Sequence, residues 1–170
     1  MILRTPMSLG LSILLALPVL AAAHDGKHAS SPDSPIAPQA QPAVRVVEQF
    51  STALQVGDLK QAGSLLADDV LILESGGAER SRDEYLGHHA VSDAAFLKGA
   101  HVQVKQRTAR VDGNLAWVGT ESELHTSKDG KPLTLLSTET MVLRRVGNNW
   151  RIAHIHWSSR TKPSTKQDAF

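Results

Sequence analysis

The C-terminal part of the chain carries four consecutive runs of strand-forming residues, and these runs constrain the fold more than any other feature. They cover residues 101–111, 115–126, 133–146 and 150–159, and apolar and polar side chains alternate along most of each run. The segments between them contain the Asp, Asn and Gly residues typical of tight hairpin turns. Because strands joined by hairpins pair with their neighbours, the pattern predicts an antiparallel meander.

The residues before these strands show helical periodicity. Val47, Phe50 and Leu54 lie on one face of a helix that we predict over residues 44–56. The segment Asp58-Leu59-Lys60-Gln61 has the spacing of a capping box, so we expect a second, short helix to begin there.

A short strand and a third helix complete the predicted domain. The apolar residues 70–74 predict a strand that ends at Gly76-Gly77. The segment Ser81-Arg82-Asp83-Glu84 is a second capping box, and it predicts a helix that continues to about Leu97. Helices followed by an antiparallel sheet predict an α+β fold.

Both ends of the chain differ in composition from this domain, which we place at residues 43–160. Residues 1–23 combine one early cation, a short apolar run and a final Ala-Ala-Ala, the pattern of a cleavable secretory signal. The run is shorter than the roughly 20 apolar residues that span a membrane. We therefore expect a periplasmic or secreted protein that has no membrane contact after cleavage. Residues 24–42 predict a flexible linker, and residues 161–170 predict a polar tail.

Composition excludes several classes of function. The formal net charge is +1, with acids and bases interspersed, so nucleic acid is not an expected partner. The chain has no cysteine, which rules out disulfides, thiolate metal ligands and cysteine nucleophiles. Phosphate-binding and dinucleotide-binding glycine motifs do not occur, and we predict no cofactor.

The last two predicted strands carry a pattern that is similar to a known family. Glu139-Thr140 is followed by Trp150 and then by His154-Ile155-His156-Trp157-Ser158. This pattern and the order of elements resemble the nuclear transport factor two-like superfamily, which includes ketosteroid isomerases and SnoaL-like cyclases. The resemblance is closest to the branch that contains the association domain of calcium/calmodulin-dependent protein kinase type two.

The resemblance implies a cone in which a curved antiparallel sheet wraps around three N-terminal helices and encloses a pocket. Met141 stands where that branch carries a pocket arginine, which argues against a carboxylate-binding pocket. The superfamily includes enzymes, ligand binders and oligomerisation modules, so the fold alone leaves the function open.

The alternation of side chains divides the predicted sheet into two faces. If Asp129-Gly130 is a two-residue turn, Thr120 lies opposite Glu139. If Asn148-Asn149 is the next turn, the even-numbered residues of the last strand lie on the same face as Thr120 and Glu139. A three-residue turn would move them to the opposite face. The predicted pairs in that last hairpin are Leu143 with His154 and Met141 with His156. The polar and apolar groups expected on the pocket face are Thr120, Glu139, Met141, Leu143, His154 and His156.

Glu139, His154 and His156 form the predicted catalytic group. A carboxylate beside an imidazole raises the imidazole pKa toward the operating pH, where proton transfer is efficient. The alternative is a hydrogen-bonded cluster that completes the inner face of the sheet and has no catalytic role.

The third helix adds two predicted ligand-binding residues, Tyr85 and His89. Both lie on a helix face that would point into the pocket, whereas His88 would face solvent. His89 and Asp93, four residues apart, could form an imidazole–carboxylate pair at the pocket mouth. A packed or solvated His89 is the alternative.

The other face of the sheet would carry Trp117, Val142, Ile155 and Trp157, an apolar patch that predicts a homodimer interface. The most direct interpretation is a domain that binds a small organic molecule, with possible isomerase or hydratase acid–base chemistry. A non-enzymatic oligomerisation module is the second hypothesis. Copper or zinc binding at His24 and His28 is the third, although no metal site is predicted inside the domain.

Overall fold

The computed structural model describes residues 35–163. The predicted signal segment and most of the predicted linker and tail, including His24 and His28, lie outside these residues. No helix in the described part of the chain has the length and apolar character needed to cross a bilayer. The elements are η1 (Pro38–Ala40), α1 (Gln41–Val56), α2 (Leu59–Leu65), β1 (Leu66–Glu74), β2 (Gly77–Glu79), α3 (Arg82–Gly87), α4 (His89–Lys98), β3 (His101–Asp112), β4 (Leu115–Lys128), β5 (Lys131–Val146) and β6 (Asn149–Thr161).

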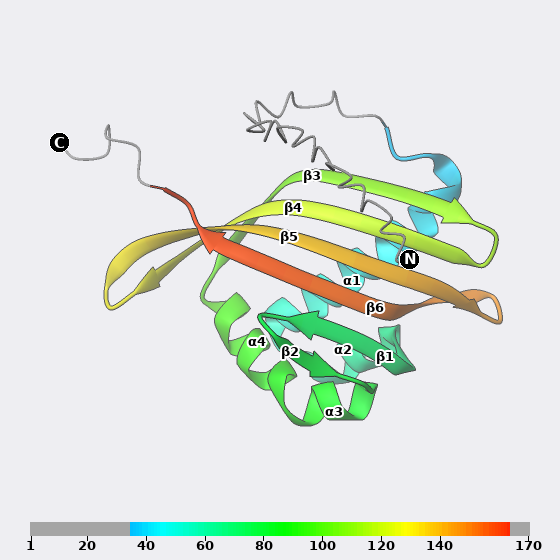
Figure 1. The fold of residues 1–170 in the computed structure, drawn as a ribbon, viewed down its shortest axis with the longest axis horizontal. Coiled ribbons are helices and arrows are strands. Elements are labelled where there is room, and N and C mark those ends of the chain that lie inside the picture. Colours follow the sequence, from blue (N-terminus) through cyan, green and yellow to red (C-terminus); the bar gives the residue numbers. More distant parts are fainter. Residues whose placement is uncertain (1–34, 164–170) are drawn as a thin grey trace, which may run out of the picture. The chain divides into compact units, whose positions relative to one another are not determined.

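The strands form one curved, open six-stranded sheet in the order β2-β1-β6-β5-β4-β3 (Figure 1). The predicted meander from β3 to β6 is confirmed, and with the N-terminal helices it gives the predicted α+β fold. One pairing differs from the predicted antiparallel sheet, because β1 runs parallel to β6. Two helices and four strands separate β1 from β6, and a connection of that length permits parallel pairing.

The first two helices form where the sequence predicts them. Val47, Phe50 and Leu54 of α1 are buried together, and the helix ends at Gly57, whose φ of 80° lies in the left-handed region that glycine adopts without steric cost. Asp58 caps α2, since its side chain accepts a hydrogen bond of 2.9 Å from the backbone N–H of Gln61.

The region between α2 and β3 is more divided than predicted. The chain breaks at His88, whose φ of −126° and ψ of −88° are not helical, so α3 and α4 are separate helices. Residues 77–79 pair with β1 as a short strand, where we predicted only a turn. Residues 38–42 are helical and Ala40 is buried, so the packed domain begins inside the segment predicted as a linker.

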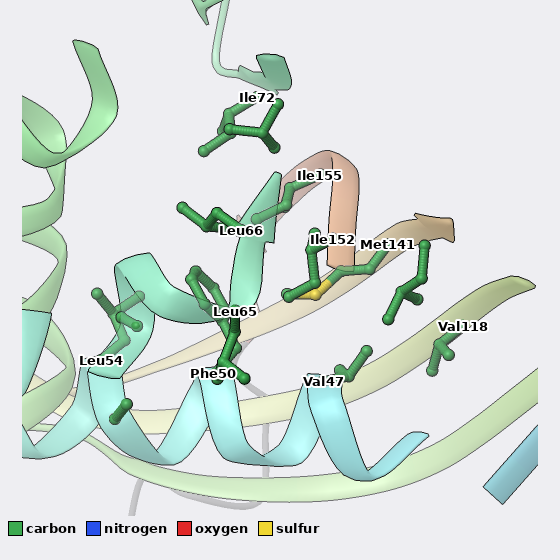
Figure 2. Close-up of a cluster of buried hydrophobic side chains, with 14 of the residues drawn as sticks. Val47, Phe50, Leu54, Leu65, Leu66, Ile72, Val118, Met141, Ile152 and Ile155 are labelled. Carbon is green, nitrogen blue, oxygen red and sulfur yellow. The ribbon is translucent and has the colours of Figure 1, made fainter. Parts of the chain in front are cut away.

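The hydrophobic core lies between α1 and the inner face of the sheet (Figure 2). Phe50 and Val47 point from α1 toward Met141, Ile152 and Ile155 on the strands. Complete burial of each of these side chains contributes about 1.5–3 kcal/mol relative to exposure. This packing fixes α1 against the sheet.

The predicted register is confirmed for one hairpin and wrong for the next. Thr120 lies opposite Glu139, as predicted from the Asp129-Gly130 turn. In the last hairpin the turn is Gly147-Asn148, so Val146 pairs with Asn149. This shifts the pairing of β6 with β5 by two residues, which by itself would leave each residue of β6 on its predicted face.

A β-bulge then reverses the faces of β6. Leu143 pairs with Ile152, but Val142 pairs with His154, so one extra residue of β6, Ala153, is accommodated between these pairs. Beyond the bulge Ile155 and Trp157 face the core, and the strand's even-numbered residues face outward. The physical reason is burial, since an unbulged strand would bury two imidazoles and leave an isoleucine and a tryptophan on the outer face.

Candidate functional site

A cavity of about 540 Å³ lies between α1, α4 and the inner face of the sheet. Its walls combine apolar side chains with a few charged ones, which is the usual composition of a site for a small organic molecule. The apolar lining includes Phe50, Leu54, Leu97, Val102, Leu124 and Leu135. The charged lining comprises Glu48, Glu74, Asp93, Arg107 and Glu139.

The sheet wall of the cavity holds a group of linked polar residues, which we call the sheet cluster: Arg107, Thr120, Glu139 and Trp157. The indole N–H of Trp157 donates a hydrogen bond of 2.8 Å to Glu139 Oε2. Burial raises the pKa of Glu139 above its ordinary value, although this hydrogen bond and the Arg107 charge partly offset the shift. Glu139 is therefore a carboxyl group that can hold or release a proton nearer to neutral pH than an exposed glutamate.

Arg107 connects the sheet cluster to α1. Its Nη1 lies 2.6 Å from Glu48 Oε1, and its Nε donates a hydrogen bond of 3.3 Å to Thr120 Oγ1. The bulge in β3 between Val104 and Gln106 changes the strand phase, and Arg107 lies opposite Thr120 on the inner face. The guanidinium is thus held in position at the cavity wall and supplies its positive charge beside Glu139.

A second group of polar residues, which we call the helix cluster, comprises Glu74, Glu79, Tyr85, His89 and Asp93. Glu74 and Asp93 line the cavity, and Glu74 pairs with Trp157 of the sheet cluster across the β1–β6 ladder. The fully buried Tyr85 donates a hydrogen bond of 3.0 Å from its hydroxyl to Asp93 Oδ2. Burial and the Asp93 charge raise the pKa of Tyr85, so its hydroxyl stays protonated. Burial also raises the pKa of Asp93, and the pKa of Glu74 is raised by burial and by Asp93.

His89 does not pair with Asp93 as the helical spacing suggested. Its Nδ1 contacts Oε1 of Glu79, the buried last residue of β2. The break at His88 places His89 at the start of α4, next to the β1–β2 hairpin. Glu74, Glu79 and His89 together offer the ligand atoms that a metal ion could use.

The structure brings together only part of the predicted site. Glu139 and Thr120 line the cavity, and Tyr85 reaches it through Asp93. Met141 and Leu143 are on the predicted face, but they are fully buried in the core and do not line the cavity.

His154 and His156 lie away from Glu139, on the outer face of β6. His154 Nδ1 lies 2.8 Å from the backbone oxygen of Leu71, and His156 is exposed opposite Thr140. The premise that the two histidines share a face with Glu139 is therefore wrong, because the bulge at Ala153 rotates this part of the strand. Trp157 pairs with Glu139 in the structure.

Sequence reasoning missed Arg107, Trp157 and Glu74 as cavity residues. Trp157 could have been predicted from the tendency of large apolar residues such as Ile155 and Trp157 to be buried, if that tendency had been weighted above the strict alternation of side chains along the strand. Arg107 depends on a bulge in β3, and Glu74 depends on the parallel pairing of β1, neither of which has a local sequence signal.

The comparison with family models matches a SnoaL-like domain over residues 44–161. A comparison with curated proteins finds no match. Among solved structures, a candidate ketosteroid isomerase from Shewanella frigidimarina NCIMB 400 is 36% identical, with a TM-score of 0.66 over 69% of this chain and 94% of the other.

More distant structures share the fold. A candidate calcium/calmodulin-dependent protein kinase II association domain from Xanthomonas campestris is 20% identical, with a TM-score of 0.59 over 75% of this chain and 94% of the other. A candidate dehydratase of the NTF2-like family from Streptomyces avermitilis is 19% identical, with a TM-score of 0.56 over 71% of this chain and 95% of the other. The nuclear transport factor two-like fold expected from the sequence is thus confirmed, and the chain belongs to the SnoaL-like family.

Proposed function

We propose that the cavity binds a small, largely apolar organic molecule and that Glu139 transfers a proton to or from it, in an isomerase- or dehydratase-type reaction. The observation that carries this proposal is the sheet cluster, a carboxyl group held by an indole N–H in the wall of a 540 Å³ cavity. The similarity to a candidate ketosteroid isomerase at 36% identity supports the reaction class.

Glu139 meets the physical requirements of a general base. Its desolvated position raises its pKa, so the ionised form is more basic than an exposed glutamate. The hydrogen bond from Trp157 fixes the orientation of one carboxylate oxygen. The other oxygen is then the one that would accept a proton from a bound molecule.

The helix cluster would supply the complementary group. Asp93 lines the cavity and burial raises its pKa, and in its protonated form it can donate a hydrogen bond to a carbonyl oxygen as negative charge develops there. Ketosteroid isomerase is a worked case of a carboxylic acid that is kept neutral for this purpose. The two clusters would in this way divide proton removal from charge stabilisation.

A β,γ-unsaturated ketone is a suitable first substrate, because its isomerisation needs only these groups. Glu139 would take a proton from the carbon between the carbonyl and the double bond and return it to the γ-carbon, which yields the conjugated ketone. Ultraviolet absorbance of the conjugated product measures the rate. We expect Glu139→Gln to lower kcat by at least about a hundredfold, the usual contribution of a general base.

Glu121→Gln is the matched control, because Glu121 is an exposed glutamate on the outer face of β4. It should leave the rate unchanged. Native mass spectrometry of the purified protein tests binding separately by detecting a retained molecule. An equal loss of activity in both variants, or full activity in Glu139→Gln, would refute the assignment of Glu139.

We also propose that the protein is exported, because residues 1–23 have the composition of a secretory signal. N-terminal sequencing of the protein from an extracytoplasmic fraction should begin at His24 or within a few residues of it. Recovery of soluble protein that retains Met1 from that fraction would contradict the proposal.

A homodimer through the outer face of the sheet is the third part of the proposal. Trp117 remains 39% exposed on that face and supports it, whereas Ile155 and Trp157 face the interior, contrary to our prediction, and cannot contribute. Trp117→Glu should convert dimers to monomers in sedimentation. A native protein that is already monomeric at micromolar concentration would exclude this interface.

A further inference from the structure

We propose that Glu74, Glu79 and His89 form a binding site for a divalent transition-metal ion of the zinc type. One potential ligand atom from each of these residues lies within 4.8 Å of the others. The sequence predicted no metal site in the domain, because the three residues follow no recognised ligand spacing.

The fold brings the ligands together through the β1–β2 hairpin and the start of α4. Ile72 pairs with Glu79 and Glu74 pairs with Gly77, so the two glutamates occupy diagonal positions on one face of the hairpin. His89 begins α4 directly after the break at His88 and contacts Glu79. A hairpin and a helix terminus thus hold three ligands in place before any ion binds.

Glu79 provides the independent sign of a ligand. Only 3% of its side chain is exposed, and its Oε2 is buried without a hydrogen-bond partner in the described part of the chain. Its Oε1 contacts His89, whose side chain is 52% exposed. A buried carboxylate oxygen without a partner costs free energy, and coordination by a cation would remove that cost.

The donor set matches zinc better than magnesium or calcium. Zn²⁺ accepts both imidazole nitrogen and carboxylate oxygen ligands, whereas Mg²⁺ and Ca²⁺ prefer oxygen ligands alone. Three protein ligands leave one coordination position for water or another ligand. Since Glu74 also lines the cavity, that position would lie near the bound organic molecule.

The test is zinc binding by tag-free protein, measured by calorimetry and by the thermal unfolding midpoint. We expect one Zn²⁺ per chain and a rise in Tm in the native protein and in the His24→Ala/His28→Ala variant. His89→Gln and Glu79→Gln should each weaken binding by at least about tenfold, the scale of losing a metal-site interaction. His88→Gln is the matched control and should bind as the native protein does.

Three results would overturn the proposal. They are the absence of binding at micromolar Zn²⁺, loss of binding in the His24→Ala/His28→Ala variant, and unchanged binding in both His89→Gln and Glu79→Gln. If circular dichroism shows that Glu79→Gln does not fold, His89→Gln decides, because that side chain is half exposed and its replacement should leave the fold intact.

Discussion

At the sheet cluster, Glu139 lies among fixed hydrogen-bond donors, whereas at the helix cluster Glu74, Glu79 and Asp93 lie close together around His89. Trp157 donates to Glu139, and the charge of Arg107 lowers the cost of its ionisation. At the helix cluster burial raises the pKa of Glu74 and of Asp93, and the Asp93 charge raises that of Glu74 further.

One cavity therefore holds carboxyl groups whose surroundings suit two tasks. A single carboxylate oriented by a neutral donor suits proton transfer, because only one charge must be tolerated at a time. Several acids around one imidazole offer carboxylate oxygens to a divalent cation, which would balance their charge when they ionise. The three experiments below test this division.

The largest expected effect comes from removing the donor of the sheet cluster. Trp157→Ala deletes a ring that stacks on Phe50 at 6.4 Å between centroids and leaves Glu139 without its indole partner. We expect a loss of about 3 kcal/mol in the free energy of unfolding, the low end of the cost of truncating a core aromatic residue, because Trp157 is only partly buried. Urea denaturation measures it.

Trp117→Ala is the control for that experiment, because Trp117 is a tryptophan on the opposite face of the sheet. Measured at concentrations where the protein is monomeric, its loss should be under about 1 kcal/mol, as for most exposed positions. Equal losses in the two variants would mean that the assignment of the faces is wrong.

The second effect comes from removing the donor of the helix cluster. Tyr85→Phe keeps the ring in the core and deletes the hydroxyl that donates to Asp93 at 3.0 Å. We expect a loss of about 1–3 kcal/mol, because a buried acceptor loses its partner. The free energy of unfolding at neutral pH checks this prediction. We expect the combined variant Tyr85→Phe/Asp93→Asn to remain less stable than the native protein, because Asp93 also interacts with other groups of the helix cluster. Full recovery of stability would show that Asp93 interacts with Tyr85 alone.

The helices and the β4–β5 hairpin could be predicted because their signals are local. Asp58 and Ser81 cap helices within three residues of themselves, and Asp129-Gly130 fixes the pairing of Thr120 with Glu139. The prediction fails at β6 because the bulge at Ala153 depends on residues far away in the chain. Ile155 and Trp157 turn inward to meet Phe50 and Tyr85, and no turn residue records that contact.

In the candidate site, too, the residues with local signals were predicted and those that depend on long-range contacts were not. Glu139 and Thr120 were placed correctly because they lie on the regular hairpin, but the two histidines of β6 were not. The helix cluster joins residues from three elements through the parallel β1–β6 pairing and the break at His88. Residues so distant in sequence are brought together only by the tertiary structure, and the sequence analysis named Tyr85, His89 and Asp93 but neither glutamate.

The smallest expected effect is a pH dependence of opposite sign at two acids. Because the pKa of Glu139 is raised, between the ordinary value of 4.5 and the raised value the native state binds more protons than the unfolded chain. The free energy of unfolding therefore falls as pH rises through that window. Glu139→Gln does not titrate, so its stability relative to the native protein should be higher at neutral pH than below pH 4.5.

Asp69→Asn is the control with the opposite sign. Hydrogen bonds from Arg144, one of them 3.0 Å long, lower the pKa of the exposed Asp69. The stability from this pair is present above the ordinary value of 3.8 and is lost as pH falls through the lowered pKa. Asp69→Asn should thus be slightly less stable than the native protein at neutral pH and equal to it at strongly acidic pH. Unfolding curves across this pH range measure both effects. If Glu139→Gln loses stability relative to the native protein as pH rises, the carboxylate of Glu139 is stabilised in its ionised form. The contrast between the two clusters would then disappear.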